Sequence, residues 1–297
     1  MPSLIDIRRR IRSVKNTQQI TKAMKMMSAA RLRRAQERVI AARPYSNLMR
    51  SMIASLVIRL NVARPEGDTG PLHPLLARRP SKKILLVVMG GDKGLAGAFN
   101  TNVNKLAMAF LQEHQGQDVE MIAVGKKPRD FFRRRRTLAA DWADIFAKVE
   151  HSSAREISAE IGARYSDGRA DVVYIIYNEF KSVIAQKLNT IVLLPLSKDD
   201  VDADMGPAAG EQVDFIYEQP PAELLGKLMP RYLELQVYRC MLESAAAEHA
   251  SRMTAMDKAS KSAAEMIDNL TLKMNGIRQA TITREIIEIV SGAAALG

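Results

Sequence analysis

Apolar residues recur at helical spacing through residues 3–43, a stretch of forty-one positions without glycine or proline. The spacing of three or four residues predicts one long amphipathic helix. A first apolar stripe begins with Leu4, Ile7, Ile11 and Val14, and a second, on a different face, comprises Ile20, Met24 and Met27. A helix with two apolar faces is expected to contact more than one surface. Pro44 should bend or interrupt this helix, and a further helix is predicted from Tyr45 to about Leu60.

A second such stretch covers residues 231–275, again without glycine or proline. Its apolar and small residues keep steps of three and four, a pattern typical of a coiled-coil seam: Met253, Met256, Ser260, Ala263, Ile267, Leu270, Met274 and Ile277. We expect the two stretches to pair with each other in an antiparallel arrangement. The second stretch is the longer, so its apolar end beyond Ile282 should project alone. Pro220-Pro221 should open this helix, and Pro230 should kink or break it.

Between the two stretches the pattern changes to short apolar runs that alternate with helical segments. Strands are predicted at residues 83–89, 119–124, 171–177 and 188–194, and helices at 99–113, around 131 and at 152–165. Strands that alternate with helices indicate a mostly parallel sheet, whereas the last two strands have no helix between them and should form an antiparallel hairpin.

The predicted fold class is therefore mixed α/β: a long antiparallel two-helix coiled coil of the two termini, plus a central Rossmann-like α/β domain. We place the N-terminal coiled-coil helix at residues 1–60, the α/β domain at 61–220 and the C-terminal coiled-coil helix at 221–297. Prolines and glycines in residues 61–81 predict a linker, and the acidic residues 197–214 predict a surface loop.

The net charge of +11 is concentrated in the first helix. Residues 1–44 hold twelve Arg or Lys against Asp6 and Glu37, a net of +10, whereas residues 231–297 hold eight of each sign. Such a helix predicts an anionic partner: nucleic acid, lipid head groups or an acidic protein surface. The first helix lacks the aromatic residues that stack on single strands. A basic coiled-coil protein that binds nucleic acid nevertheless stays open as an alternative.

The glycine-rich turn of residues 90–97 follows a predicted strand and precedes a helix, which is the context of a phosphate site. Its details do not fit, because neither the lysine and hydroxyl residue of a Walker loop nor the Gly-x-Gly-x-x-Gly spacing is present. We interpret it as a tight turn with Asp92 and Lys93 at the surface. An α/β enzyme that uses this turn remains a further alternative.

Other candidate chemistry is sparse. The four histidines are far apart in the sequence and predict no metal site, and the single cysteine, Cys240, is interpreted as a packing residue. The run Arg133 to Arg136 could dock on an anionic surface, but we interpret it as a solvated helix end. These patterns predict a protein without its own catalytic site, cofactor or metal.

No apolar run approaches the roughly 20 residues that cross a bilayer, and no secretory signal is recognised. We therefore expect no direct insertion into a membrane. The lone cysteine fits a reducing compartment.

Three motifs together resemble the gamma subunit of F-type ATP synthase, over essentially the whole chain. They are Asn16 to Met26 with Ala42 to Tyr45, the turn Gly91 to Leu95 with Asn100 to Asn102, and the ending Arg278 to Ile286 with Ser291 to Ala295. The resemblance implies a central rotor stalk without an active site, which couples proton-driven rotation of the membrane ring to ATP synthesis or hydrolysis. The implied partners are the alpha and beta subunits, the epsilon subunit and the membrane rotor ring of c subunits, with no nucleic acid. The implied location is peripheral, at the cytoplasmic face of the cell membrane.

The resemblance also implies roles for individual residues. Met24 would meet an acidic lever loop of a beta subunit, with Lys22 and Lys25 as its basic flank and Arg252 across the shaft. Further contacts would be made by the polar catch Arg278, Gln279, Thr283 and Glu285, the apolar tip from Ile286, and the rotor-ring contact at Tyr217 and Glu218. Pro230 departs from the family's continuous helix, and the paired-cysteine insert of photosynthetic relatives is absent, so thiol regulation is not expected.

Overall fold

The structure, a computed structural model, describes residues 4–62, 70–183, 185–195, 215 and 217–294. In chain order the elements are α1 (Leu4–Val62), η1 (Pro74–Leu76), β1 (Lys83–Met89), α2 (Phe99–Glu113), β2 (Asp118–Val124), α3 (Lys126–Phe132), β3 (Ala140–Trp142), α4 (His151–Ser166), β4 (Val172–Phe180), β5 (Gln186–Leu194) and α6 (Pro221–Ala294). These elements confirm the mixed α/β class. The predicted loop at 197–214 and part of the predicted linker lie outside the described residues.

Contacts within the chain define two compact units. Unit 1 comprises residues 1–29 and 252–297, and unit 2 comprises residues 30–251. Each long helix therefore contributes to both units, with divisions inside α1 and α6. Residues 49–56 of α1 and 225–245 of α6 share the core of the α/β unit. The three segments predicted from the sequence, 1–60, 61–220 and 221–297, stay a prediction.

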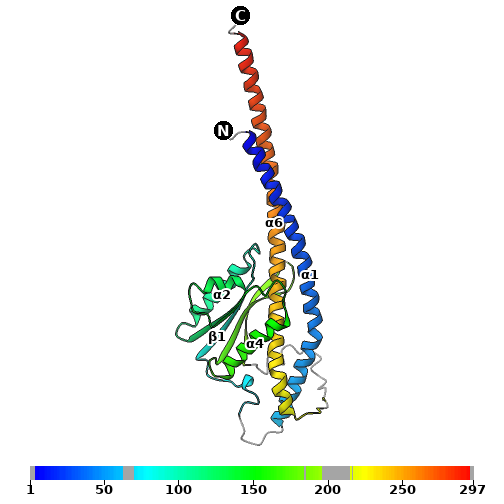
Figure 1. The fold of residues 1–297 in the computed structure, drawn as a ribbon, viewed down its shortest axis with the longest axis vertical. Coiled ribbons are helices and arrows are strands. Elements are labelled where there is room, and N and C mark those ends of the chain that lie inside the picture. Colours follow the sequence, from blue (N-terminus) through cyan, green and yellow to red (C-terminus); the bar gives the residue numbers. More distant parts are fainter. Residues whose placement is uncertain (1–3, 63–69, 184, 196–214, 216, 295–297) are drawn as a thin grey trace. The chain divides into compact units, whose positions relative to one another are not determined.

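Unit 2 is built on a five-stranded sheet in the order β3-β2-β1-β4-β5. β1 pairs in parallel with β2 and β4, and β3 pairs in parallel with β2. β5 pairs antiparallel with β4, so the predicted hairpin is confirmed. β1 lies in the centre, and its residues Ile84 to Met89 are all buried, as expected for a parallel strand covered on both faces (Figure 1).

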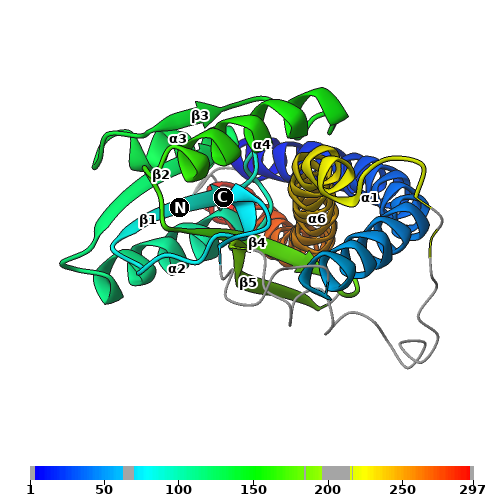
Figure 2. The ribbon, with the colours of Figure 1, turned by 90° about the horizontal axis from the view of Figure 1, so that it is seen from below.

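The two faces of the sheet carry different helices. Leu86 and Val88 of β1 pack against α2 and against Phe132 of α3. Leu85 and Val87 face a larger core that includes α4, residues 49–56 of α1 and residues 225–245 of α6. In the end-on view these α1 and α6 segments lie beside β4 and β5 (Figure 2). Each fully buried leucine or isoleucine stabilises the fold by about 1.5–3 kcal/mol.

Neither helical proline ends its helix. Pro44 lies within α1 and Pro230 within α6, so neither proline interrupts its helix, and a bend at Pro44 or a kink at Pro230 stays a prediction. Both prolines are exposed, and buried residues on neighbouring turns, such as Met49 and Tyr232, anchor the flanking helix in the core. Packing on both sides offsets the missing backbone hydrogen bond.

Candidate functional site

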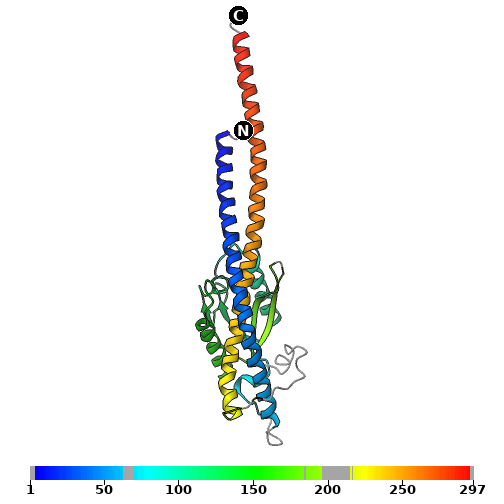
Figure 3. The same cartoon turned by 90° about the vertical axis from the view of Figure 1, so that its right-hand side faces the viewer.

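The seam of unit 1 joins the first part of α1 to the last part of α6. The two helices run antiparallel, and α6 continues past the N-terminal end of α1 (Figure 3). Buried side chains on the seam are mostly small or unbranched: Ile7, Thr21, Ser28, Met256 and Ala263. The Thr21 hydroxyl is satisfied locally, since it donates to the Gln18 carbonyl at 2.9 Å. Small residues allow two backbones to approach closely over a narrow interface.

An ion-paired cluster fixes Lys25 on this pair of helices. The Lys25 ammonium lies 2.5 Å from Oδ1 of Asp257, and the Lys261 ammonium lies 3.1 Å from the other oxygen. The hydrogen bond from Lys25, followed by that from Lys261, lowers the pKa of the Asp257 carboxyl below its ordinary value. Lys25 is thus held toward α6, whereas Lys22 is exposed to solvent.

Apolar side chains lie exposed around these cations. Ile20 is 60% exposed, Met26 and Met27 are similarly exposed, and Met24 is half-buried. Sequence reasoning identified Ile20, Met24 and Met27 as a second stripe but missed Met26, and it missed the exposed Met266 and Leu272 of α6. Met26, Met266 and Leu272 do not follow the three- and four-residue spacing of the seam, and this could have identified them as exposed. The result is an outer surface in which apolar and basic groups alternate.

Arg252 differs from the other residues predicted to contact partners. It is only 7% exposed, so its guanidinium group does not stand open to solvent in the chain alone. The structure therefore presents Lys22, Met24 and Lys25 as candidate contact residues more openly than Arg252.

The last part of α6 is an uncovered helix. From Arg278 onward every described side chain except that of Thr281 is exposed. This segment includes the predicted polar catch, Arg278, Gln279, Thr283 and Glu285, and the predicted apolar tip from Ile286. The Thr283 hydroxyl donates to the Gln279 carbonyl at 2.9 Å, so it is already satisfied by its own helix. Exposed isoleucines at 286, 287 and 289 confirm the predicted projecting apolar end.

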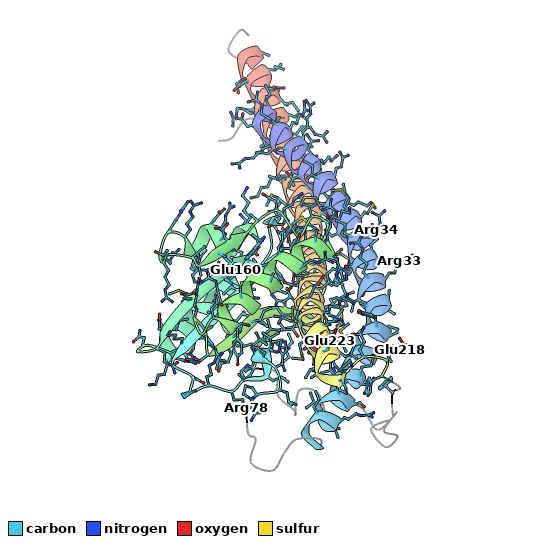
Figure 4. All side chains as sticks on the ribbon, turned by 60° about the horizontal axis from the view of Figure 1, so that its bottom comes forward. Arg33, Arg34, Arg78, Glu160, Glu218 and Glu223 are labelled. Carbon is cyan, nitrogen blue, oxygen red and sulfur yellow. The ribbon has the colours of Figure 1, made fainter. Side chains whose placement is uncertain are left out.

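Tyr217 and Glu218 lie in unit 2, just before α6. The Tyr217 hydroxyl donates to Ser55 Oγ at 2.8 Å, and the Arg59 guanidinium lies 5.4 Å from the centre of the tyrosine ring. These contacts hold Tyr217 on α1, whereas Glu218 is exposed (Figure 4). The Glu218 carboxylate is therefore exposed next to a residue, Tyr217, that is held on α1.

The glycine turn of residues 90–97 is held by hydrogen bonds to other parts of the fold. The Asp92 carboxylate is 7% exposed and accepts hydrogen bonds from the backbone N–H groups of Lys126, Asp144 and Phe146 at 2.7 to 2.9 Å. The Gly91 N–H donates to Asn100 Oδ1 at 2.8 Å. The prediction of a surface Asp92 is therefore wrong, although Lys93 is exposed. Asp92 thus ties the glycine turn to the first residue of α3 and to the segment that follows β3.

Among the described residues, no three His, Cys, Asp or Glu side chains are grouped so that they could hold a metal ion. No helix within the described part of the chain is long and apolar enough to cross a membrane.

The surface of unit 1 carries exposed basic and apolar side chains. The glycine turn of the α/β unit uses its Asp92 carboxylate within the fold. These features are typical of the class of proteins that work through contacts with partners. A family model described as ATP synthase matches residues 3–296. The "ATP synthase gamma chain" of Solibacter usitatus is 53% identical over 296 residues, which cover 99% of each chain. That of Pelotomaculum thermopropionicum is 44% identical, with 100% of both chains covered. The chain therefore belongs to the ATP synthase gamma family.

Solved structures show the same fold. The Euglena gracilis mitochondrial ATP synthase contains a chain that matches with a TM-score of 0.65 and 20% identity, covering 99% of this chain and 94% of that one. A chain of the central stalk and c-ring of the Tetrahymena thermophila mitochondrial enzyme matches with a TM-score of 0.60 and 22% identity, covering 81% of this chain and 99% of that one. None of these matches supports the alternative of a nucleic-acid-binding protein.

Proposed function

We propose that this chain is the central rotor stalk of an F-type ATP synthase, which transmits rotation between a membrane ring and a ring of alpha and beta subunits. The observation that carries this proposal is the uncovered surface of unit 1, where Met24, Lys22 and the helix from Arg278 onward are available to partners. A shaft that touches each surrounding subunit differently biases their conformations differently, which is the requirement for coupling.

In this function the chain supplies contacts rather than catalysis. The Asp92 carboxylate of the glycine turn is engaged within the fold by the backbone N–H groups of Lys126, Asp144 and Phe146, which supports placing the nucleotide sites on other subunits. The chain would be peripheral to the membrane, at its cytoplasmic face, with the epsilon subunit and the c ring as partners of unit 2. Tyr217 and Glu218 would contribute to the c-ring contact.

The residues of unit 1 would divide the work of coupling. Met24 would enter an apolar contact with a beta subunit, and Lys22 and Lys25 would attract its acidic loop. Because Asp257 already engages Lys25, the exposed Lys22 would provide the freer charge. Arg278, Gln279, Thr283 and Glu285 would form directional polar contacts, and the apolar tip from Ile286 would sit in an apolar bearing.

The proposal is tested by replacing Met24 with lysine in the assembled complex. An unpaired cation in an apolar contact costs more than the about 1–3 kcal/mol of an uncharged polar group. We expect ATP-driven proton pumping in inverted membrane vesicles to fall roughly tenfold relative to ATP hydrolysis. Ile40→Lys, an exposed apolar position of α1 in unit 2, is the matched control and should stay close to the unsubstituted complex.

Unchanged pumping in the Met24→Lys complex would refute the proposed contact. The broader proposal fails if the purified chain hydrolyses ATP by itself, or if alpha and beta subunits do not co-purify with it.

A further inference from the structure

Four consecutive arginines form a hollow that the proposed function does not use. Arg133 to Arg136 follow the end of α3 in unit 2, and all four are exposed. Together with Thr137, Leu138 and Asp141 they line a hollow of about 490 Å³. The run was interpreted from the sequence as a solvated helix end, and the exposure of all four side chains just past α3 agrees with that interpretation.

Two of the arginines are oriented by neutral groups. The Arg135 guanidinium lies 3.8 Å from the centre of the Phe131 ring and donates to the Phe131 carbonyl at 2.7 Å. Arg136 donates to the Val119 carbonyl at 3.2 Å. Both contacts restrict the side chains while leaving their positive charge in place. Ordering of this kind before binding reduces the entropy that a ligand must overcome.

The charge of the hollow is not balanced by nearby acids. Within the described part of the chain, no carboxylate oxygen lies within 4.0 Å of the guanidinium nitrogens of residues 133 to 136. Asp141 lines the hollow, but its carboxylate lies 4.0 Å from the guanidinium of Arg129. The hollow is therefore lined by four arginines and one carboxylate, that of Asp141, whose charge is partly neutralised by Arg129.

These features indicate the chemistry of a ligand. Guanidinium groups bind phosphate oxygens through paired N–H donors, and several adjacent arginines favour a group with more than one negative oxygen. The lining contains no aromatic residue, so it offers no platform for stacking a nucleobase. The small concave shape fits one compact phosphate-bearing group better than an extended acidic segment.

We infer that this hollow is a docking site for the headgroup of an anionic phospholipid. The source follows from the place of the chain in a membrane-bound assembly, so the inference rests on the peripheral location in the proposed function. Each arginine near an anionic membrane surface contributes about 1 kcal/mol of attraction. The hollow would give unit 2 a weak, salt-sensitive contact with the membrane in addition to its protein partners.

The test uses the assembled complex of this chain with its alpha, beta and epsilon subunits, after co-purification has established assembly. Binding is measured by flotation with vesicles of phosphatidylcholine alone or with added phosphatidylglycerol. The variant Arg133→Ser/Arg134→Ser removes two exposed cations of the hollow and leaves Arg135 and Arg136 in place. The matched control, Lys126→Ser/Lys127→Ser, removes two exposed cations from the other end of the same helix.

We expect the unsubstituted complex and the control to bind vesicles that contain phosphatidylglycerol, with binding that weakens as salt is raised. The arginine variant, which lacks two cations, should bind roughly thirtyfold more weakly. Equal losses in both variants, or no loss in the arginine variant, would overturn the inference. Binding of inorganic pyrophosphate without binding to vesicles would reassign the hollow to a soluble phosphate and also overturn it.

If the arginine variant lost a co-purifying subunit but still bound vesicles, the ligand of the hollow would be an acidic protein surface, and the lipid inference would be overturned. Failure of the complex to assemble in the first step would contradict the proposed function instead, so the two failures are distinguishable.

Discussion

Gly125 lies where the end of β2 approaches the end of β1. Its φ angle is 104°, a region that residues with a side chain rarely adopt. A Cβ atom at this position would lie 2.2 Å from the Gly90 carbonyl oxygen. The Gly125 N–H donates to the Trp142 carbonyl at 2.6 Å, so the backbone is held on two sides. The close approach of the two backbones therefore requires a glycine at position 125.

Replacing Gly125 with alanine should lower the free energy of unfolding by at least about 3 kcal/mol, from strain and a backbone clash. The measurement is urea denaturation of the full chain. Gly94→Ala is the control, because a Cβ atom at Gly94 would have no atom within 4 Å, and it should change stability by less than about 0.5 kcal/mol. Similar losses of stability in Gly125→Ala and Gly94→Ala would show that the backbone relaxes to remove the clash at residue 125, which would contradict the prediction.

The buried position of Asp92 could not be predicted from the sequence. Its acceptor role depends on the N–H groups of Asp144 and Phe146, which lie more than fifty residues further along the chain. The local pattern of glycines around a charged pair correctly indicated a tight turn. It contained no information about which of the two charged residues would face the interior.

Element types followed well from periodicity where the apolar pattern was long. The predicted bounds of β1 and α2 agree with the structure, and those of α4 differ by one residue at each end. β3 was missed because Ala140, Asp141 and Trp142 form no apolar run and become a strand only by pairing with β2. The surface positions of Lys22, Gln279 and Ile286 could likewise be predicted, but their contacts with partners depend on other chains.

The ion-paired cluster gives the seam of unit 1 a dependence on pH. Because the pKa of Asp257 is lowered in the folded chain, its stabilising contribution is present above the unfolded value of 3.8 and is lost as pH falls through the folded value. Asp257→Asn should therefore lower the melting temperature slightly at pH 7. The difference from the unsubstituted chain should disappear as the pH falls below 3.8.

Circular dichroism of the full chain across this pH range is the measurement. Asp268→Asn, an exposed carboxylate further along α6, should show no comparable change. A constant difference between Asp257→Asn and the unsubstituted chain at all pH values would contradict the role of the ion pairs.

Within the last part of α6, polar and apolar positions should respond differently to change. Gln279→Ala removes a side chain with directional hydrogen bonds, worth about 1.5–3 kcal/mol where the partner is charged. We expect ATP hydrolysis by the assembled complex to fall roughly tenfold. Deletion of residues 294–297 should cost less than about twofold, because an end in an apolar bearing has few directional contacts.

The comparison is made on the same assembled complex, with Asn269→Ala as the control for loss of an exposed amide on α6. Equal losses from Gln279→Ala and the deletion would contradict the distinction between the polar catch and the apolar tip.

At the scale of the whole molecule, the two units differ in how they are stabilised. Unit 2 has a sheet whose central strand is buried on both faces, whereas unit 1 has one narrow seam and an uncovered helix end. Most helical stability in proteins comes from packing of an apolar face, and residues 278–294 have no such packing within the described chain. Local stability should therefore vary strongly along α6.

Hydrogen exchange of the isolated chain should show this gradient. Amides of residues 278–294 should exchange fastest, those of the seam more slowly, and those of β1 and β4 slowest. Mass spectrometry of the exchanged chain provides the measurement, and comparison with the assembled complex should show protection gained at residues 278–294. Uniform protection along α6 in the isolated chain would contradict this expectation.

The divisions between the two units fall inside helices and not in loops. Neither α1 near Ala29 nor α6 near Ser251 contains a glycine or proline that would provide a pivot. A turning force applied to unit 2 must therefore pass to unit 1 through two stiff, hydrogen-bonded rods. Twisting them stores elastic energy in many slightly strained backbone bonds, and that energy can be returned when a resisting subunit yields. The chain would thus act as a torsion spring that smooths a stepwise rotation.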